Sequence, residues 1–597
     1  MREFSVPATT EVGPDEALPD LLAKNVAEVG DQTGFRVQRG GEWQDVTWKE
    51  FGDQVAGVAK GLIASGVAAG DRVGLQAKTR YEWAVIDFAI WTAGAATVPI
   101  YETSSSDQVA WILSDSGATA VIVERDEHAA AVESVREQTP DLASVYVIED
   151  GAVDQLTAAG RDVPDSELES RRKTLHADSL ATLIYTSGTT GRPKGCELTH
   201  GNFLFEIGNG MSLLGRFLNM EGSILLFIPL AHVLARVIHV GAVKTRTVVG
   251  HTPDVKNLVD DLGEFKPTFV LAVPRVFEKV FNSAKAKAEG AGKGKIFDKA
   301  AQVAIDWSRA QDEGGAGIVL KGQHALFDKL VYGKLRAALG GRCLGAISGG
   351  APLGDRLGHF FRGIGVTVYE GYGLTETTAA AAVNHDEALR IGTVGRPLPG
   401  VDFAIGDDGE VLIRGGIVMR GYWKNEEATK EAIDGEGWFH TGDLGELDDD
   451  GFLKITGRKK EILVTAGGKN VAPAVLEDRL RAHRLVSQCI VVGDQRPYIA
   501  ALITLDEEAL PAWLQSKGKP AGQSVEDVRE DPELQAEIDA AVKEANKAVS
   551  HAEAIKKFKI LGTDFTEDNG MLTPSLKLKR AVVMKQFDSE VEGLYAR

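Results

Sequence analysis

The stretch Tyr185-Thr186-Ser187-Gly188-Thr189-Thr190-Gly191-Arg192-Pro193-Lys194-Gly195 organises the interpretation of the whole chain. The apolar residues just before it, from Leu180 to Ile184, predict a buried strand. Its glycines let the backbone approach an anion, its hydroxyls and N–H groups can donate hydrogen bonds, and Lys194 adds a positive charge. The stretch therefore predicts a phosphate-binding loop, with a Gly/Thr-rich surface turn as the alternative. It is not a Walker loop, because Pro193 stands where that motif needs glycine.

Size and composition indicate a globular protein with several domains. A chain of 597 residues is too long for one hydrophobic core, and its 44% hydrophobic and 25% charged residues are typical of a globular protein. The formal net charge of −20 argues against a nucleic-acid partner, because such proteins use clustered Lys and Arg. Cys196, Cys343 and Cys489 are widely spaced, so neither disulfides nor a zinc site is indicated. Because no secretory signal and no long uncharged apolar run is recognisable, we expect a cytoplasmic protein.

The N-terminal part of the chain alternates helical and strand patterns. Thr47 and Glu50 have capping-box spacing before a predicted helix, which we expect to end at Gly66. A strand, a helix and two more strands are predicted next, at residues 71–75, 84–93, 96–100 and 118–123. This alternation predicts an α/β fold with largely parallel sheets. The charged, poorly periodic stretch from Asp150 to His176 predicts a surface connection.

Further motifs with polar or glycine-rich ends follow the predicted phosphate loop: Pro229-Leu230-Ala231-His232, Ser348-Gly349-Gly350-Ala351-Pro352-Leu353, Tyr369-Glu370-Gly371-Tyr372-Gly373-Leu374-Thr375-Glu376, Thr441-Gly442-Asp443, Gly457-Arg458-Lys459-Lys460-Glu461, Thr465-Ala466-Gly467-Gly468-Lys469-Asn470 and Leu572-Thr573-Pro574-Ser575-Leu576-Lys577. His232 follows a predicted strand, where open α/β sheets place ligands, although a structural role in the core is the alternative. Asp443 offers two acceptor oxygens to vicinal hydroxyls, or else forms an Asx turn. Tyr372 can stack on a flat base or pack in the core, and Glu376 supplies a hard oxygen suited to Mg²⁺.

These motifs, in this order, resemble the adenylate-forming enzymes, a superfamily of acyl-CoA synthetases, firefly luciferases and peptide-synthetase adenylation domains. The resemblance runs from about Phe51 to Arg580. Residues 266–280 resemble a segment of the long-chain fatty-acid branch. The resemblance implies a layered α/β fold in which β-sheets flanked by helices form a large N-terminal domain, residues 1–458. A small, mobile α+β domain is expected at residues 459–597.

The resemblance also assigns roles to individual residues. It implies an ATP site built from Thr186, Ser187, Gly188, Thr189, Thr190, Lys194, Gly350, Ala351, Glu370, Gly371, Tyr372, Asp443 and Arg458. Thr375 and Glu376 would act beside the phosphates, with Glu376 as the Mg²⁺ ligand, and His232 would line the substrate site. Lys577 would be the catalytic lysine, although Lys579 and Arg580 make a solvated basic cluster the alternative. The sequence Ser-Leu-Lys departs from the Ser-Gly-Lys of many members.

The implied reaction joins a long-chain fatty acid to coenzyme A at the expense of ATP. Gly467 and Gly468 would lie against the coenzyme A tunnel, and Lys460 would be the hinge between the two half-reactions. One alternative is an acyl-adenylate ligase that loads a carrier protein, and another is a catalytically silent ATP-binding regulator.

The segment 282–340 reads as an insertion of helices joined by Gly-rich turns. It contains ten Lys or Arg residues against six Asp or Glu. Leu326, Phe327, Leu330, Val331 and Leu335 fall on one side of a predicted helix, with Lys329 and Arg336 on the other. This pattern predicts reversible peripheral membrane contact, while an internal core helix is the alternative.

Overall fold

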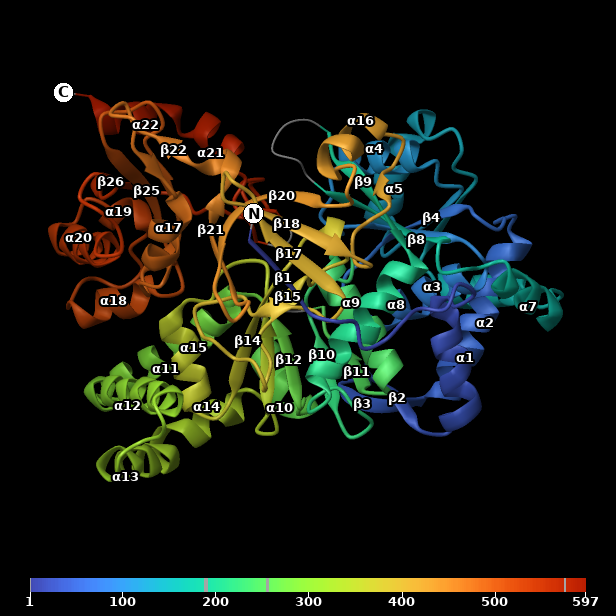
Figure 1. The fold of residues 1–597 in the computed structure, drawn as a ribbon, viewed down its shortest axis with the longest axis horizontal. Helices are drawn as coiled ribbons and strands as arrows, with labels where there is room; N and C mark the ends of the chain where they lie inside the picture. Colours follow the sequence, from blue (N-terminus) through green and yellow to red (C-terminus); the bar gives the residue numbers. More distant parts are fainter. Residues whose placement is uncertain (1, 187–191, 254–256, 574–575, 597) are drawn as a thin grey trace.

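The two strands that flank the predicted phosphate loop, β8 (Leu180–Thr186) and β9 (Lys194–Thr199), lie near one edge of a mainly parallel sheet in the computed structural model (Figure 1), which describes residues 2–186, 192–253, 257–573 and 576–596. Across this sheet the strands are β19 (Gly421–Tyr422), β9, β8, β5 (Ala96–Ile100), β4 (Arg72–Gln76), β6 (Ala120–Val123) and β7 (Ser144–Val147). The strands from β8 to β7 are parallel, whereas β9 pairs antiparallel with β8 and β19. The predicted strands are confirmed, and the β8–β9 hairpin carries the loop.

Helices flank this sheet: α1 (Leu18–Val29), α2 (Trp48–Ala64), α3 (Tyr81–Thr92), α4 (Ser106–Ser116), α5 (Asp126–Ser134) and the short η1 (Arg136–Gln138). The predicted capping box at the start of α2 is confirmed: Thr47 Oγ1 accepts from Glu50 N at 3.2 Å, and Glu50 Oε2 accepts from Thr47 N at 2.8 Å. Gly66 follows the helix with a φ of +95°, a conformation that glycine adopts without strain.

The stretch from Asp150 to His176 is a largely exposed connection between β7 and β8, as predicted, but most of it is helical. This stretch forms α6 (Ala152–Ala159) and α7 (Asp165–Lys173). Each helix buries few side chains, so the apolar period is too weak to identify in the sequence. Gly61 of α2 explains the packing of α6, because a Cβ there would lie 2.1 Å from the Leu156 carbonyl oxygen. Tertiary contact, rather than local periodicity, makes this segment helical.

A second sheet brings several motifs to one edge. Across it the strands are β16 (Arg396–Pro397), β15 (Ala382–Val383), β14 (Thr367–Tyr372), β13 (Gly345–Ser348), β12 (Phe269–Ala272), β10 (Ser223–Leu226), β11 (Val248–His251), β2 (Thr33–Arg39) and β3 (Glu42–Thr47). Its strands from β14 to β2 are parallel. The motifs after β10, β13 and β14 therefore share the carboxyl edge, where α/β sheets bind ligands.

The second sheet is accompanied by α8 (His200–Gly210), η2 (Met211–Leu214), α9 (Val233–Thr245), α10 (Leu258–Phe265), α15 (Asp355–Gly363) and η5 (Thr375–Thr377). An antiparallel third sheet follows, with β1 (Arg2–Ser5), β17 (Val401–Ile405), β18 (Glu410–Gly415), β20 (Phe439–Leu447) and β21 (Leu453–Arg458), together with α16 (Glu426–Ala432). The β20–β21 register places Asp443 opposite Arg458.

The predicted helical insertion is present as α11 (Pro274–Gly290), α12 (Gly294–Asp312), α13 (Ile318–Phe327), η4 (Asp328–Tyr332) and α14 (Gly333–Ala338). Its predicted apolar face is wrong in part. Phe327 and Leu335 are buried, whereas Leu326 and Leu330 are 56% and 51% exposed. The five-residue π-helical turn η4 shifts the side-chain positions, so one face of a regular helix does not describe the segment.

The C-terminal region contains a three-stranded sheet of β24 (Val486–Val492), β25 (Ile499–Leu505) and β26 (Ile555–Ile560), with a hairpin of β22 (Leu463–Val464) and β23 (Asn470–Val471). The short 3₁₀ turn η6 (Lys459–Glu461) begins this region. Its α-helices are α17 (Pro473–Arg481), α18 (Leu510–Ser516), α19 (Val525–Val528), α20 (Pro532–Asn546), α21 (Arg580–Gln586) and α22 (Asp588–Tyr595). The predicted α/β class, with a large N-terminal and a small C-terminal domain, is confirmed.

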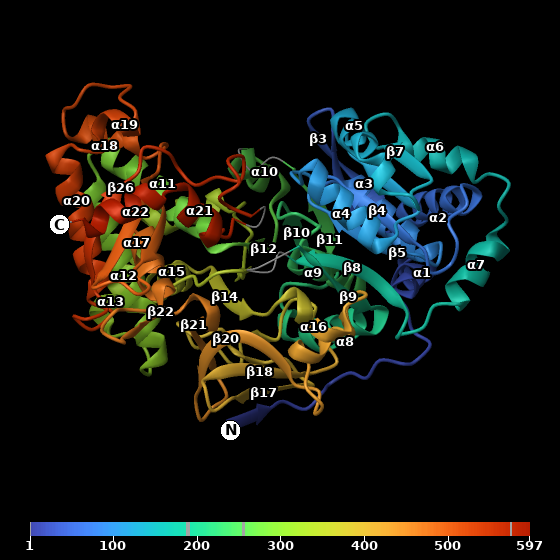
Figure 2. The same cartoon turned by 90° about the horizontal axis from the view of Figure 1, so that it is seen from above.

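The C-terminal elements lie beside the insertion helices in both views (Figures 1 and 2). Three ion pairs join α11 to the C-terminal domain: Arg275–Asp506 at 3.0 Å, Lys279–Glu508 at 2.8 Å and Glu289–Arg484 at 2.6 Å. Thr103, which follows β5 of the first sheet, also donates a hydrogen bond to Glu567 of the C-terminal region. Among the described residues, no helix combines the length and the apolar character needed to cross a bilayer.

Candidate active site

The loop after β13 is fixed by a carboxylate from the neighbouring strand. Glu370 pairs with Ser348 in the β13–β14 register, and its Oε1 accepts a hydrogen bond from Leu353 N at 2.8 Å. This contact holds the turn that contains Gly350 and Ala351, both of which are exposed. Gly350 has a φ of +85°, so the turn favours glycine there. The backbone of Gly350 and Ala351 is therefore accessible at the sheet edge, and we call this surface the backbone ledge.

Burial raises the pKa of Glu370 to about 7, the Leu353 N–H opposes that rise, and the nearby Asp355 and Asp478 carboxylates add to it. Between the ordinary pKa of a glutamate and about 7, the folded protein therefore holds a proton that the unfolded chain has released. Stability from this group is present at low pH and is lost as the pH rises through that window.

We expect Glu370→Gln to remove this contribution, because glutamine keeps the acceptor oxygen and does not titrate. The melting temperature of the variant, relative to that of wild type, should rise between pH 5 and pH 8. Asp478, whose pKa burial raises to about 6, titrates in both proteins, so the difference in melting temperature reports Glu370 together with its interaction with Asp478. A constant difference across this range, measured by differential scanning fluorimetry, would contradict the assignment.

Asp443 lies at the junction of the second and third sheets. Its Oδ2 accepts from the Tyr372 hydroxyl at 2.6 Å, and its Oδ1 accepts from Arg458 Nε at 2.8 Å. Asp443 is only 4% exposed. Each carboxylate oxygen can accept a further hydrogen bond, so the group remains able to receive vicinal hydroxyls. The tyrosine and the arginine fix its orientation.

Lys577 reaches the same place from the C-terminal domain. A Cβ placed on Gly350 would lie 3.9 Å from Lys577 Cε. The surrounding protein lowers the pKa of Lys577, the Arg458 guanidinium lowers it further, and the Asp443 and Glu376 carboxylates raise it. Residue 577 as a whole is exposed, whereas the lowered pKa reflects burial of its ammonium group. Leu576, immediately before it, has a φ of +60°.

His232 forms the N-cap of α9, and its Nδ1 accepts a hydrogen bond from Leu234 N at 3.2 Å. Burial lowers the pKa of His232 to about 3, and the charge of Lys577 adds to the effect. The imidazole is therefore neutral at pH 7. With Nδ1 acting as acceptor, Nε2 carries the proton and can donate one hydrogen bond.

The phosphate loop is described only at its flanks. Thr186 pairs with Lys194 at the open end of the β8–β9 hairpin, and Trp111 Nε1 donates to Pro193 O at 2.8 Å. The predicted ligands Ser187, Gly188, Thr189 and Thr190 lie outside the described residues. Lys194 Nζ lies 4.7 Å from the centre of the Tyr422 ring. The hairpin therefore brings the lysine beside Tyr422 of β19, at the edge of the first sheet.

Thr375 and Glu376 form the turn η5 directly after β14, and both are partly buried. Gly371 pairs with Val383 in the β14–β15 ladder. Gly373 must be glycine, because a Cβ there would lie 1.6 Å from the Ala379 carbonyl oxygen. This close approach turns the chain, and Glu376 Oε1 then accepts from the Tyr422 hydroxyl at 2.9 Å.

Sequence reasoning missed the role of Tyr422. The triplet Gly421-Tyr422-Trp423 stands out in the sequence, yet nothing local indicates its contact with both Lys194 and Glu376. That contact depends on how β19 joins the first sheet.

Three predicted residues are not brought to this cluster. Gly467 and Gly468 lie in the turn between β22 and β23, are exposed, and have open space around them: a Cβ at Gly468 would meet nothing within 4 Å. Lys460 is exposed in η6, between β21 and the C-terminal elements. In this arrangement Lys577, and not the glycine pair, faces Gly350.

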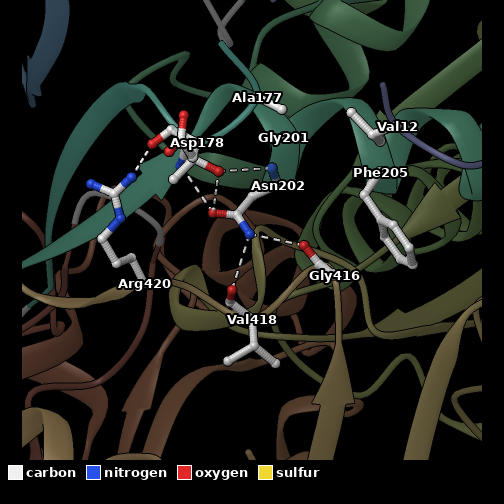
Figure 3. A pocket seen from close by; sticks show the side chains of 10 residues that line it. Val12, Ala177, Asp178, Gly201, Asn202, Phe205, Gly416, Val418 and Arg420 are labelled. Carbon is white, nitrogen blue, oxygen red and sulfur yellow. Dashed lines mark hydrogen bonds between the residues drawn. The ribbon is translucent and has the colours of Figure 1, made fainter. Parts of the chain in front are cut away.

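A separate surface pocket of about 420 Å³ lies at the start of α8 (Figure 3). Its polar groups largely satisfy one another: Asn202 Nδ2 donates to Gly416 O at 2.8 Å and to Val418 O at 3.0 Å, and Arg420 donates to Asp178 O. These bonds join β9, α8 and the third-sheet region. We interpret the pocket as the outer side of a structural junction.

Comparisons with known proteins agree with this geometry. The AMP-binding enzyme family matches residues 22–423, and the AMP-binding enzyme C-terminal domain matches residues 460–597. The long-chain-fatty-acid–CoA ligase FadD15 of Mycobacterium bovis is 55% identical over 598 residues, covering all of both chains. The long-chain-fatty-acid–CoA ligase ACSBG2 of Xenopus laevis is 30% identical, covering 98% of this chain and 84% of its own length.

Among solved structures, the A-PCP didomain of carboxylic acid reductase from Segniliparus rugosus, in complex with AMP, superposes with a TM-score of 0.75 at 22% identity. The match covers 99% of this chain and 84% of that one. At this identity the likeness establishes the fold alone. The family matches over residues 22–423 and 460–597 show that this chain belongs to the AMP-binding enzyme family.

Proposed function

We propose that this protein is a long-chain fatty acid–CoA ligase that forms AMP. The single observation that carries this proposal is the 55% identity to a long-chain-fatty-acid–CoA ligase over the full length of both chains. In the first step the fatty acid carboxylate attacks the α-phosphate of ATP and releases pyrophosphate. In the second step the thiol of coenzyme A displaces AMP.

The residues at the sheet edge fit ATP. The ledge at Gly350 and Ala351, with Glu370, Gly371 and the Tyr372 ring, is suited to the adenine. Asp443 would accept the ribose hydroxyls, with Arg458 holding the carboxylate in place. Thr186 and Lys194 would flank the phosphates, together with the loop residues 187–190. The fit rests on the accessible ledge and on the remaining acceptor capacity of Asp443.

Glu376 fits a magnesium site in which the protein supplies one carboxylate ligand. Among the described residues, no group of three or more His, Cys, Asp or Glu side chains could hold a metal ion alone. Mg²⁺ in nucleotide sites commonly uses one or two carboxylates and takes its other ligands from phosphates and water, so a lone glutamate suffices. When bound, the ion would neutralise phosphate charge.

Lys577 is the residue we assign to the charge that develops between the carboxylate and the α-phosphate. Its position beside Gly350, and its coupling to Asp443 and Glu376, support that role. Neutral His232 would donate from Nε2 to the fatty acid carboxylate, and Thr375 would donate to a phosphate oxygen. Neither residue needs to transfer a proton.

The second step requires a different placement of the C-terminal domain. Lys577 faces Gly350 in this structure, whereas the Gly467–Gly468 turn that would line the coenzyme A path lies in open space. We propose that residues 459–597 rotate about Lys460 as a unit, relative to residues 1–458, between the half-reactions.

The proposed function is tested by pyrophosphate release across fatty acids of different length. We expect release that depends on a long-chain acid, followed by AMP release that depends on coenzyme A without any carrier protein. AMP release that needs a carrier would favour the carrier-loading alternative. Absence of pyrophosphate release with every acid would favour a silent ATP-binding regulator.

We also propose that the insertion contacts anionic membranes to collect acyl chains. Ile318 and Val319 are 87% and 72% exposed, and Leu326 and Leu330 add two more exposed apolar side chains on α13 and η4, which together we call the apolar strip. Lys321, Lys329 and Lys334 are exposed on the same segment, and among the described residues none of them forms an ion pair. Figure 1 places α13 at the periphery of the molecule. The apolar strip can enter the interface while the lysines meet anionic headgroups.

The triple variant Lys321→Gln/Lys329→Gln/Lys334→Gln should bind phosphatidylglycerol liposomes roughly a hundredfold more weakly, since each lysine near such a surface contributes about 1 kcal/mol. Co-sedimentation measures the bound fraction. The control Lys430→Gln/Lys543→Gln/Lys585→Gln removes the same charge from α16, α20 and α21. An equal loss of liposome binding in both triple variants would contradict a specific binding surface on the insertion. Equal liposome binding by wild type and the Lys321/Lys329/Lys334 variant would refute the proposed electrostatic contribution.

A further inference from the structure

The segment around β19, residues 419–423, contacts both the hairpin that flanks the predicted phosphate loop and the turn that contains Glu376. Trp423 N donates to Gly195 O at 2.8 Å, and Tyr422 pairs with Cys196, so the segment extends the hairpin that carries the loop. On its other side, Met419 N donates to Glu376 O at 2.8 Å. One short segment thus fixes the backbone of the loop hairpin and of the metal-ligand turn.

Within this segment, the side chain of Tyr422 contacts both Glu376 and Lys194. Its hydroxyl donates to Glu376 Oε1 at 2.9 Å, and its ring faces Lys194 Nζ at 4.7 Å. Its own backbone is held by α16, because Tyr422 N donates to Thr429 Oγ1 at 2.9 Å. Gly421 permits this contact, since a Cβ there would lie 2.8 Å from Thr429 Cγ2. The ring is therefore placed by the fold and not by its two charged neighbours alone.

Tyr422 also keeps two opposite charges apart. Among the described residues, no ion pair joins Lys194 to Glu376, although both touch the same side chain. In that part of the structure, only Oε1 of Glu376 has a hydrogen-bond partner, which leaves Oε2 available. A direct Lys194–Glu376 pair would occupy the phosphate cation and the metal ligand together.

We propose that Tyr422 is a positioning residue: its hydroxyl orients Glu376 toward Mg²⁺, while its ring holds Lys194 for the phosphates of ATP. This inference rests on the proposed function. A hydrogen bond to one carboxylate oxygen restricts the rotation of Glu376 and directs the other oxygen. The cation–π contact positions the lysine without neutralising it.

Tyr422→Phe separates the two roles, because it keeps the ring and removes the hydroxyl. We expect a roughly tenfold higher KM for Mg²⁺, the lower end of the range for losing a hydrogen bond to a charged group. The KM for fatty acid, and kcat at saturating Mg²⁺, should change less than twofold. Mn²⁺ binding in the presence of a non-hydrolysable ATP analogue, followed by electron paramagnetic resonance, should weaken by a similar factor. Tyr422→Leu should additionally raise the KM for ATP.

Trp423→Phe is the matched control. It removes one hydrogen bond of the same segment, from Trp423 Nε1 to Asp115 O at 3.0 Å, without touching Glu376. Its Mg²⁺ dependence should be that of wild type. In the Glu376→Gln background, Tyr422→Phe should have no further effect on Mn²⁺ binding, which a double-mutant cycle measures.

Wild-type Mg²⁺ dependence and Mn²⁺ affinity in Tyr422→Phe would overturn the proposal. An equal shift in Trp423→Phe would overturn it too, by showing a general effect of the segment. Failure of the proposed function itself gives a different result, because wild type would then form no acyl-CoA from a long-chain acid, ATP and coenzyme A, whatever the Mn²⁺ affinity of Tyr422→Phe.

Discussion

Replacing Lys577 by alanine is expected to slow acyl-adenylate formation by a factor on the order of 10²–10³, the range for one preorganised electrostatic donor. The lysine lies beside Gly350 and interacts electrostatically with Asp443 and Glu376, so its charge is directed at the place where phosphate charge would develop. ATP–pyrophosphate exchange measures this step. Thioester formation from supplied acyl-adenylate should largely survive, because Lys577 is not needed after adenylation.

Lys579→Ala is the control for this prediction. Lys579 belongs to the same basic cluster, but it is the N-cap of α21, and its backbone N donates to Met571 O at 2.8 Å. We expect near-normal exchange for this variant. Normal exchange in Lys577→Ala combined with loss in Lys579→Ala would reverse the assignment.

A reversible cross-link between the two domains should abolish acyl-CoA formation while sparing adenylation. Thr103 and Glu567 make a hydrogen bond across the domains in the pose that brings Lys577 to Gly350. Thr103→Cys/Glu567→Cys, joined by a short bis-methanethiosulfonate reagent, would hold that pose. The native cysteines are buried and should not compete. We expect ATP–pyrophosphate exchange within a few-fold of wild type and almost no acyl-CoA.

Adding dithiothreitol should restore acyl-CoA formation, which separates immobilisation from damage. Each single-cysteine variant, treated in the same way, should retain both half-reactions. If the cross-linked protein makes acyl-CoA at the normal rate, rotation of residues 459–597 about Lys460 is not required.

Much of the fold follows from local sequence signals. The Thr47–Glu50 capping box and the apolar runs of β5 and β8 identify their elements because each signal acts within a few residues. The helix α6 was missed because its packing depends on the close approach of Gly61 in α2. The hydrophobic periodicity of α6 does not reveal this packing, because the packing depends on a glycine in another helix.

The candidate site shows the same division. Asp443, Tyr372 and Lys577 are identifiable because they lie in motifs whose order resembles a known family. The contact of Tyr422 with Glu376 depends on where β19 joins the first sheet, and the ion pairs of Arg275 and Lys279 depend on the position of another domain. Their partners are far away in sequence, so no local pattern predicts them.

The backbone of Leu576 sets the stiffness of the turn that delivers Lys577. Its φ of +60° costs a leucine on the order of 1–2 kcal/mol, a strain that glycine would not carry. Glycine at position 576 would have more backbone freedom than leucine. If residues 459–597 rotate as we propose, leucine would therefore limit the backbone conformations available just before Lys577 while that domain is displaced. The local strain at Leu576 would then be offset by a smaller conformational entropy cost each time Lys577 is placed beside Gly350.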